Sequence, residues 1–332
     1  MKIDLAIKFG SHEIIIYRKG QGIIAKEPAF LAVTPHGKRL TVKAVGKEAE
    51  KLQLSSGSNI LVHQPIKNSI VADIKLATTL IRKILEKNII DKFAIHKINA
   101  LVAVPCALGY VNLVNLKTVL MGAGINRVTF VQNGVCLREY DETLDPYANC
   151  LTVDIGKYTT DVSVLNKFAF SYGRNYQIGG VDMDTSLQTY ILDNFELEVN
   201  QTLAERIKNK VASLYQNDSY TTSFQGIAED KTYVEKQISA NEVRVAIIGV
   251  YNKIFDLILD YVKSLPKAIC AEVMKNGIMF SGGSSKIQGL QEYASKKLSL
   301  PIIEIDNPVD AVILGCAKLL DKPLKSIVKI NL

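Results

Sequence analysis

Two stretches far apart in the chain show the same pattern of apolar and polar positions. Residues 3–17 alternate between apolar and polar up to Gly10 and then resume with a second apolar run. Residues 150–165 repeat this pattern around Gly156. Alternation interrupted by a glycine turn is typical of a β-hairpin. Strand and helix signals follow each hairpin, so we predict two related domains, one beginning at each hairpin. The alternative is a chance match between two common strand–glycine–strand segments.

The rest of the pattern alternates between amphipathic helices and buried strands. Apolar residues recur at helical spacing in residues 74–87, 111–121, 183–197, 201–215 and 240–264. Continuous apolar runs predict short buried strands at residues 98–104, 128–131 and 277–281. Residues 216–237 are polar with interspersed aromatic side chains, which predicts a small exposed lobe. Strands that alternate with helices predict an α/β fold.

Composition narrows the class of protein. A chain of 332 residues is long enough for two domains, and its 7% aromatic content without Trp argues against a nucleic-acid partner. The net charge of +7 comes from scattered lysines, which fits an ordinary soluble surface or attraction to anionic lipid. Five dispersed Cys and four His show no metal-ligand or disulfide spacing. With no secretion signal and no apolar run of membrane-spanning length, we predict a cytoplasmic protein.

Several segments in one order carry a family resemblance. They are YRKGQGII (residues 17–24), AVGKEA (44–49), QPIKNSIVAD (64–73), IGGVDMD (178–184), GIMFSGG (277–283), Asp306-Asn307-Pro308 and Leu314-Gly315. Together with the two hairpins, this order resembles MreB, the bacterial rod-shape protein of the actin, sugar kinase and heat-shock chaperone ATPase superfamily. The resemblance implies an actin-like fold, in which two ribonuclease-H-like domains flank a nucleotide cleft and each carries a small subdomain. We expect domain I at residues 1–140 (small subdomain about 31–62) and domain II at 141–332 (small subdomain about 183–240).

The resemblance also implies that the hairpin turns bind the phosphates of ATP or ADP, but the second turn is altered. The family has Asp-x-Gly-Gly-Gly-Thr here. This chain keeps Asp154, Gly156 and Thr159, followed by Thr160, and replaces two glycines by Lys157 and Tyr158. If the turn requires positive φ at either position, Tyr158 introduces strain of roughly 1–2 kcal/mol. Lys157 offers an ammonium group to a phosphate in return.

The first turn is altered as well. The family's Asp-x-Gly-Thr is replaced here by Lys8, Phe9, Gly10 and Ser11. Ser11 can supply the hydroxyl, but Lys8 cannot replace a carboxylate that orients Mg²⁺. We therefore expect weakened Mg²⁺ binding at Asp154, or an ion pair between Lys8 and Asp154 across the cleft.

The implied catalytic position carries an amide. Gln132 aligns with the glutamate that positions the attacking water, and together with Asp154 it forms the candidate catalytic pair. An amide orients a water molecule but cannot accept its proton. We therefore expect ATP hydrolysis to be weak or lost.

The adenosine side of the implied site is better preserved. Its expected contacts are Gly180, Asp182, Glu205, Lys208, Gly282 and Gly283. Glu205 and Lys208 lie at i and i+3 on one helical face, so the alternative is a surface ion pair.

The implied function is a cytoskeletal filament in cell-shape determination. Its partners would be further copies of the chain, as in an antiparallel doublet, and also other MreB paralogues or cell-wall elongation proteins. An apolar loop flanked by lysines, with Ile89, Ile90 and Phe93 at its tip, would dock on the inner face of the membrane; the alternative is that it packs into the protein's own core. Two alternatives stay open for the function: a non-polymerising pseudo-ATPase scaffold and a fully active MreB ATPase. The missing catalytic acid argues against a small-molecule kinase.

Overall fold

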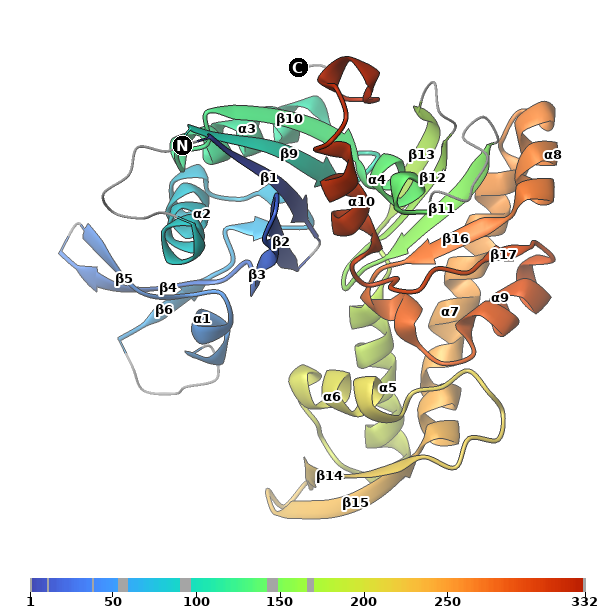
Figure 1. The fold of residues 1–332 in the computed structure, drawn as a ribbon. Helices are drawn as coiled ribbons and strands as arrows, with labels where there is room; N and C mark the ends of the chain where they lie inside the picture. Colours follow the sequence, from blue (N-terminus) through green and yellow to red (C-terminus); the bar gives the residue numbers. More distant parts are fainter. Residues whose placement is uncertain are drawn as a thin grey trace. The chain divides into compact units, whose positions relative to one another are not determined.

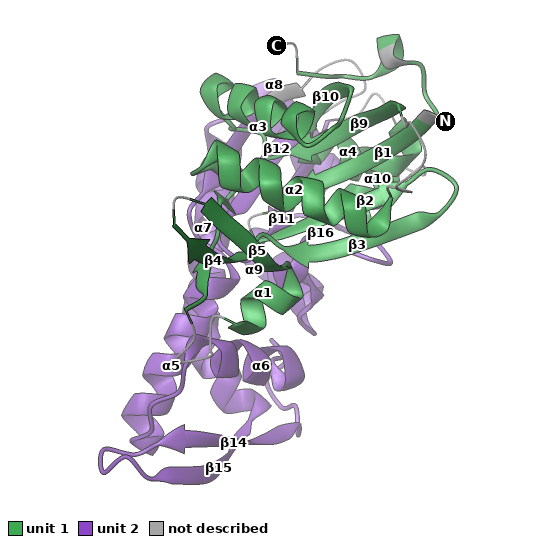
Figure 2. Cartoon of the chain, turned by 90° about the vertical axis from the view of Figure 1, so that its left-hand side faces the viewer, with its two compact units in different colours: residues 1–144, 168–170, 310–332 green, residues 145–167, 171–309 purple. Residues whose placement is uncertain are grey.

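The chain forms two units with sheets of the same strand order (Figures 1 and 2). The structure is a computed structural model that describes residues 2–10, 12–37, 39–52, 59–89, 97–141, 149–165 and 170–330. Unit 1 consists of residues 1–144, 168–170 and 310–332, and unit 2 of residues 145–167 and 171–309.

The sheet of unit 1 has the order β10-β9-β1-β2-β3. Its strands are β1 (Lys2–Phe9), β2 (Glu13–Arg18), β3 (Gly22–Pro28), β9 (Lys97–Val104) and β10 (Arg127–Gln132). β1 pairs antiparallel with β2 and parallel with β9, which in turn pairs parallel with β10. The first hairpin and the two buried strands predicted from the sequence are confirmed.

Helices cover both faces of this sheet. α2 (Ile74–Asn88) and α3 (Tyr110–Gly122) share one core with alternate strand residues such as Ile98 and Val102. The intervening Leu101 and Ala103 point to the other face, where α10 (Ala311–Leu319) packs on β1, β2, β9 and α4 (Asn133–Tyr140). The Asp73 side chain caps α2 by accepting a hydrogen bond from the Leu76 N–H.

Smaller elements complete unit 1. They are β4 (Leu31–His36), β5 (Arg39–Val45), α1 (Lys47–Leu52), β6 (Leu61–His63), β7 (Ile66–Lys67), β8 (Ile70–Val71) and the 3₁₀ turn η2 (Leu324–Ser326). β5, β4 and β6 form a three-stranded sheet against which α1 packs, and β7 and β8 form a two-stranded one.

Unit 2 repeats the strand order as β13-β12-β11-β16-β17. These strands are β11 (Cys150–Ile155), β12 (Thr160–Leu165), β13 (Phe170–Tyr176), β16 (Ile278–Ser281) and β17 (Ile302–Ile303). β11 is antiparallel to β12 and parallel to β16, as β1 is to β2 and β9. The second hairpin is therefore confirmed, and it occupies the same place in its sheet as the first.

The helices of unit 2 enclose the larger core of the chain. They are α5 (Gly180–Phe195), α6 (Gln201–Val211), α7 (Ala240–Lys263), α8 (Lys267–Asn276), α9 (Leu290–Leu298) and the 3₁₀ turn η1 (Gly283–Lys286). α7 begins at a capping box formed by Ser239 and Glu242. The polar stretch predicted as an exposed lobe is a two-stranded hairpin of β14 (Thr221–Ile227) and β15 (Tyr233–Ser239).

The C-terminal segment differs from the expected division of the chain. The sequence analysis placed residues 310–332 in domain II, whereas they belong to unit 1. The Lys26 ammonium of β3 pairs with the Asp310 carboxylate at 2.6 Å, and Gly315 of α10 packs against the Cys136 carbonyl of α4. Sequence order alone misassigned this segment because its apolar helix completes a sheet formed at the other end of the chain.

None of the helices in the described ranges is long and apolar enough to cross a membrane. Ile89, predicted at the tip of a membrane loop, is buried in the core of unit 1 directly after α2. It is therefore not available to lipid. Ile90 and Phe93 lie outside the described residues, and their membrane contact stays a prediction that vesicle sedimentation would test.

Candidate functional site

The two hairpin turns have the same backbone hydrogen bond. The Gly10 N–H donates to the Glu13 carbonyl at 2.9 Å, and the Gly156 N–H donates to the Thr159 carbonyl at 2.8 Å. Neither Lys157 nor Tyr158 takes a positive φ. The backbone strain expected at Tyr158 is therefore absent, because this turn does not use the left-handed conformation that glycine favours. Ser11 lies outside the described residues.

The N-terminus of α5 docks directly on the second turn. The Gly180 and Val181 N–H groups donate to the Gly156 and Lys157 carbonyls at 3.0 and 2.7 Å. A Cβ at Gly179 would lie only 2.7 Å from the Gly156 carbonyl oxygen, so this approach requires glycine. These two helix N–H groups are thus used inside the protein.

Two of the predicted nucleotide contacts, Asp182 and Gly282, also have structural roles. The Asp182 carboxylate caps α5 by accepting from the Gly179 N–H at 2.8 Å. Gly282 has φ +93°, and a Cβ there would clash with the Ile155 carbonyl and lie 2.6 Å from Asp154 Oδ1. Gly282 thus lets the chain after β16 pass close to β11, and its purine contact stays a prediction.

The acidic and hydroxyl residues of the second hairpin are buried. Asp154 Oδ1 accepts a hydrogen bond from Ser281 Oγ at 3.3 Å. Thr160 Oγ1 donates to the Ile178 carbonyl at 2.8 Å, and Thr159 is buried beside it. These side chains hold the hairpin to its neighbours.

Lys208 joins two elements of unit 2. Its ammonium donates to the Gly180 carbonyl at 2.9 Å and lies 2.6 Å from the Asp184 carboxylate, which is fully buried. Burial raises the pKa of Asp184, and the charge of Lys208 offsets part of that rise. Asp184 was not among the residues predicted for the site. The spacing of Asp184, three residues before Leu187 and seven before Ile191, could have placed it on the buried face of α5.

Lys157 forms the second ion pair of this region. Its ammonium lies 3.0 Å from Glu205 Oε2 on α6. Glu205 and Lys208 were predicted as neighbours on one helical face, where they would contact adenosine or pair with each other. They do not pair with each other: Glu205 pairs with Lys157 of the β11–β12 turn, and Lys208 pairs with Asp184 near the start of α5.

A cavity of about 520 Å³ opens beside these pairs, entirely within unit 2. Its lining includes Lys157, Gly180, Glu205, Lys208 and Gly283, all of which the sequence analysis had singled out. Missed lining residues include Lys210, Tyr251, Ser284 and Lys286. The Tyr251 hydroxyl donates to the Ser284 carbonyl at 2.7 Å and thereby holds η1 against α7. No motif indicates these residues, because α7 and η1 meet only in the folded unit.

The charge of this cavity favours an anion. Lys157, Lys208, Lys210 and Lys286 line it, against a single carboxylate, Glu205. Gly283 is exposed at the cavity, and a Cβ there would have no atom within 4 Å. The cavity can therefore accept a negatively charged ligand that also contains a ring.

In unit 1, two predicted residues lie at the same end of the sheet, where its parallel strands finish. Lys8 is the penultimate residue of β1 and Gln132 is the last of β10, and both are buried. The Gln132 amide donates to the Cys106 carbonyl at 3.3 Å. Burial raises the pKa of the nearby Glu13, an effect that Lys26, Lys47 and Lys8 oppose. Lys8 and Asp154 belong to different units, so their ion pair stays a prediction, which the Mg²⁺ dependence of ATP affinity in Lys8→Asp would test.

The described residues do not form a metal site of their own. No group of three or more His, Cys, Asp or Glu side chains in the described ranges could hold a metal ion. Asp154 already accepts a hydrogen bond from Ser281, and its cross-strand neighbour Asp161 accepts one from Asn175 at 3.3 Å. The weakened Mg²⁺ binding expected at Asp154 stays a prediction.

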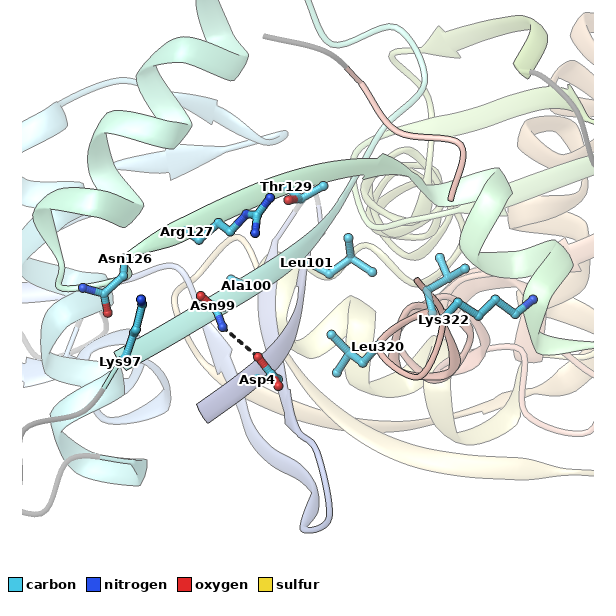
Figure 3. A pocket seen from close by; sticks show the side chains of 11 residues that line it. Asp4, Lys97, Asn99, Ala100, Leu101, Asn126, Arg127, Thr129, Leu320 and Lys322 are labelled. Carbon is cyan, nitrogen blue, oxygen red and sulfur yellow. Dashed lines mark hydrogen bonds between the residues drawn. The ribbon is translucent and has the colours of Figure 1, made fainter. Parts of the chain in front are cut away.

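A second cavity, of about 650 Å³, lies in unit 1 (Figure 3). It opens where α10 ends and the first residues of β1, β9 and β10 are left uncovered. Figure 3 shows Asn99 turned toward Asp4, to which its amide donates at 2.9 Å. Asp4 lies at the opposite end of β1 from Lys8, so this cavity is not part of the predicted phosphate site.

Comparison with known proteins decides the family. The sequence profile of the MreB/Mbl protein family matches residues 2–327. The chain belongs to the MreB/Mbl family. It is 24% identical to the cell shape-determining protein MreB of Escherichia coli K12, with 96% of this chain and 93% of that protein covered. It is 25% identical to the cell shape-determining protein Mbl of Bacillus subtilis 168, with 96% of each covered.

Solved structures confirm the actin-like α/β fold. MreB5 of Spiroplasma citri bound to ADP superimposes with a TM-score of 0.86 at 22% identity, covering 97% of this chain and 96% of MreB5. The double helical filament of MamK gives a TM-score of 0.80 at 19% identity, covering 97% of this chain and all of MamK. The MreB resemblance inferred from dispersed motifs is thus confirmed over nearly the whole chain.

Proposed function

We propose that this MreB/Mbl protein is a cytoskeletal filament protein in cell-shape determination that binds an adenine nucleotide in the cavity of unit 2. One observation carries the proposal: this cavity gathers Gly180, Glu205, Lys208 and Gly283, which were predicted from three separate segments. Two of its four lining lysines pair with Glu205 and Asp184, and Lys210 and Lys286 add positive charge that suits a phosphate. MreB5 of Spiroplasma citri, with the same fold, has been crystallised with ADP and with AMPPNP.

Weak or absent hydrolysis is part of the proposal. The Gln132 side chain is an amide that is buried and donates to the Cys106 carbonyl. It cannot take a proton from water, which supports weak or absent hydrolysis. Binding and hydrolysis are thus separable in this chain. Phosphate release above the buffer control would instead indicate an active ATPase.

Filling the cavity at Gly283 is expected to block nucleotide binding without disturbing the fold. Gly283→Leu adds a side chain where no protein atom lies within 4 Å of the new Cβ. ADP affinity, measured by calorimetry, should fall by about tenfold or more because the leucine takes space that the ligand needs. Gly109→Leu is the matched control, since Gly109 has equally open surroundings in unit 1.

The control variant should bind ADP as the natural chain does. Equal ADP affinity of Gly283→Leu and Gly109→Leu would place the nucleotide outside this cavity. No ADP binding by the natural chain would refute the nucleotide part of the proposal.

Self-association is supported by an apolar surface on α3. Tyr110, Val111, Val114 and Met121 are exposed by 37–69%, although the opposite face of the same helix packs in the core. A contiguous exposed apolar stripe on a helix marks an interaction surface. MamK, which shares this fold, forms a double helical filament. We propose that α3 contacts α3 of another copy. In an antiparallel doublet the same surface of both copies meets, so this surface must be complementary to itself.

Charging this stripe is expected to disrupt the doublet. Val114→Asp places a carboxylate on the exposed surface of α3. Because each copy contributes the same surface, every contact in the doublet would bury two like charges, one from each copy. Sedimentation and electron microscopy should show doublets lost at protein concentrations where the natural chain forms them. Val245→Asp on α7, at a site of similar exposure, is the control. If neither the natural chain nor the control formed filaments, with or without ATP, the non-polymerising scaffold would be favoured. Other MreB/Mbl proteins or cell-wall elongation proteins would then be the partners to test.

A further inference from the structure

Lys157 stands in a turn where the resemblance implies glycine, and its side chain reaches out of that turn. The ammonium lies 3.0 Å from Glu205 Oε2, and both residues line the cavity of unit 2. The Lys157 side chain is 19% exposed and that of Glu205 is 33% exposed. The pair therefore connects the β11–β12 turn to α6 along the cavity wall.

The two ion pairs at this cavity differ in how easily they exchange. Lys208 faces a fully buried carboxylate, Asp184, and also donates to the Gly180 carbonyl. Moving Lys208 would leave a buried charge without compensation, so it is fixed. Lys157 and Glu205 are both partly solvated, and separating such a pair costs little. Of these two paired lysines, Lys157 is thus the one that can change partners.

We propose that Lys157 exchanges Glu205 for a phosphate group of the ligand, so that the cavity selects nucleotides over nucleosides. The proposal rests on the proposed function and adds a selectivity determinant to it. The chemistry is an exchange of hydrogen-bond partners in which no covalent bond changes. A phosphate carries more charge than a carboxylate and accepts stronger charge-assisted hydrogen bonds.

The exchange has a consequence for Glu205. Once Lys157 has turned to the phosphate, the Glu205 carboxylate is available to accept hydrogen bonds from ligand hydroxyl groups. A nucleoside has hydroxyl groups but no phosphate, so it must either compete with Lys157 for Glu205 or separate the pair without replacing it. The Lys157–Glu205 pair therefore opposes nucleosides and favours nucleotides.

The test compares ADP with adenosine by calorimetry on the full chain. In Lys157→Met, which keeps the apolar stem and removes the charge, ADP affinity should fall by about tenfold or more. Adenosine affinity should stay the same or rise, because Glu205 is no longer paired. The ratio of the two affinities should therefore fall by at least about tenfold. Lys236→Met on β15 removes the same charge from unit 2 outside the cavity and should leave the ratio unchanged.

A second variant keeps the inference testable if Lys157→Met folds poorly. Glu205→Gln removes the competing charge and keeps the shape, so ADP affinity should hold or rise while Lys157 remains. In the Lys157→Met/Glu205→Gln double variant this gain in ADP affinity should vanish, because the lysine that would contact the phosphate is absent. An ADP-to-adenosine ratio unchanged in Lys157→Met would overturn the inference while leaving the proposed nucleotide site intact. Binding of neither ligand to the natural chain would overturn both.

Discussion

Replacing Gly315 by alanine is expected to destabilise unit 1 by at least about 3 kcal/mol, because two helix backbones meet at this residue. Gly315 lies in α10, and a Cβ there would overlap the Cys136 carbonyl oxygen of α4 and lie 3.1 Å from the Tyr140 backbone nitrogen. The clash involves backbone, so no side-chain rotation relieves it. α10 would have to move away from α4 and from the sheet strands on which it packs.

Urea unfolding monitored by circular dichroism would measure this change. Gly249→Ala is the matched control, because Gly249 lies in the interior of α7 with no atom within 4 Å of a new Cβ. That substitution should stabilise by about 0.5–1 kcal/mol through helix propensity. A Gly315→Ala chain as stable as the natural one would show that α10 does not pack on α4 as described.

The second large effect is expected at the buried ion pair of unit 2. Lys208→Met removes the only cation within 4 Å of Asp184 among the described residues and leaves its fully buried carboxylate without compensation. Breaking one partner of a buried pair costs about 3–5 kcal/mol. Thermal or urea unfolding should show a loss of this size. The Lys208→Met/Asp184→Asn double variant should recover much of it, because the unpaired charge is gone.

The Lys208→Met loss should depend on pH. Burial raises the folded-state pKa of Asp184 above the ordinary value of 3.8, and removing Lys208 raises it further. Between 3.8 and the folded-state pKa, the native state binds more protons than the unfolded state, so stability falls as pH rises through this window. The gap between variant and natural chain should therefore shrink as the pH is lowered toward about 4.

An exposed ion pair provides the control for both measurements. Lys263 and Asp260 lie 3.8 Å apart on α7, each 74% exposed. Lys263→Met should leave the unfolding midpoint close to that of the natural chain at every pH. A Lys208→Met loss no greater than that of Lys263→Met would mean that Asp184 is solvated or protonated in the native chain.

The pattern of apolar positions was sufficient to predict the repeated core of the fold. The hairpins at Gly10 and Gly156 and the buried strand before Gly282 depend on local alternation and turns, which a sequence shows directly. The place of residues 310–332 could not be predicted in this way. It depends on the fit of Gly315 against Cys136, a contact between distant segments that leaves no periodic signal.

The site shows the same division between local and long-range information. Gly180, Glu205, Lys208 and Gly283 could be placed from family motifs, and all line one cavity. Asp182 and Gly282 also serve a helix cap and a close strand approach, which a sequence cannot separate from a ligand contact, so their nucleotide contacts stay predictions. The partners of Lys157 and Lys208 depend on how α5 and α6 pack, so Glu205 and Asp184 could not be assigned to them beforehand.

The altered second turn has a physical explanation in this structure. Lys157 and Tyr158 fit without a positive φ, and Lys157 pairs with Glu205. The turn thus folds with side chains where the resemblance implies glycines, and it adds a positive charge to the cavity wall. We therefore expect this change to affect the proposed nucleotide binding more than the folding of unit 2.

A structure of the full chain determined in the presence of ADP would test the central claim most directly. The account predicts ADP in the cavity of unit 2, with its ribose near Glu205 and a phosphate near Lys157, beside Gly180 and Gly283. ADP bound in the cavity of unit 1 shown in Figure 3, or no bound ADP at millimolar concentration, would contradict it.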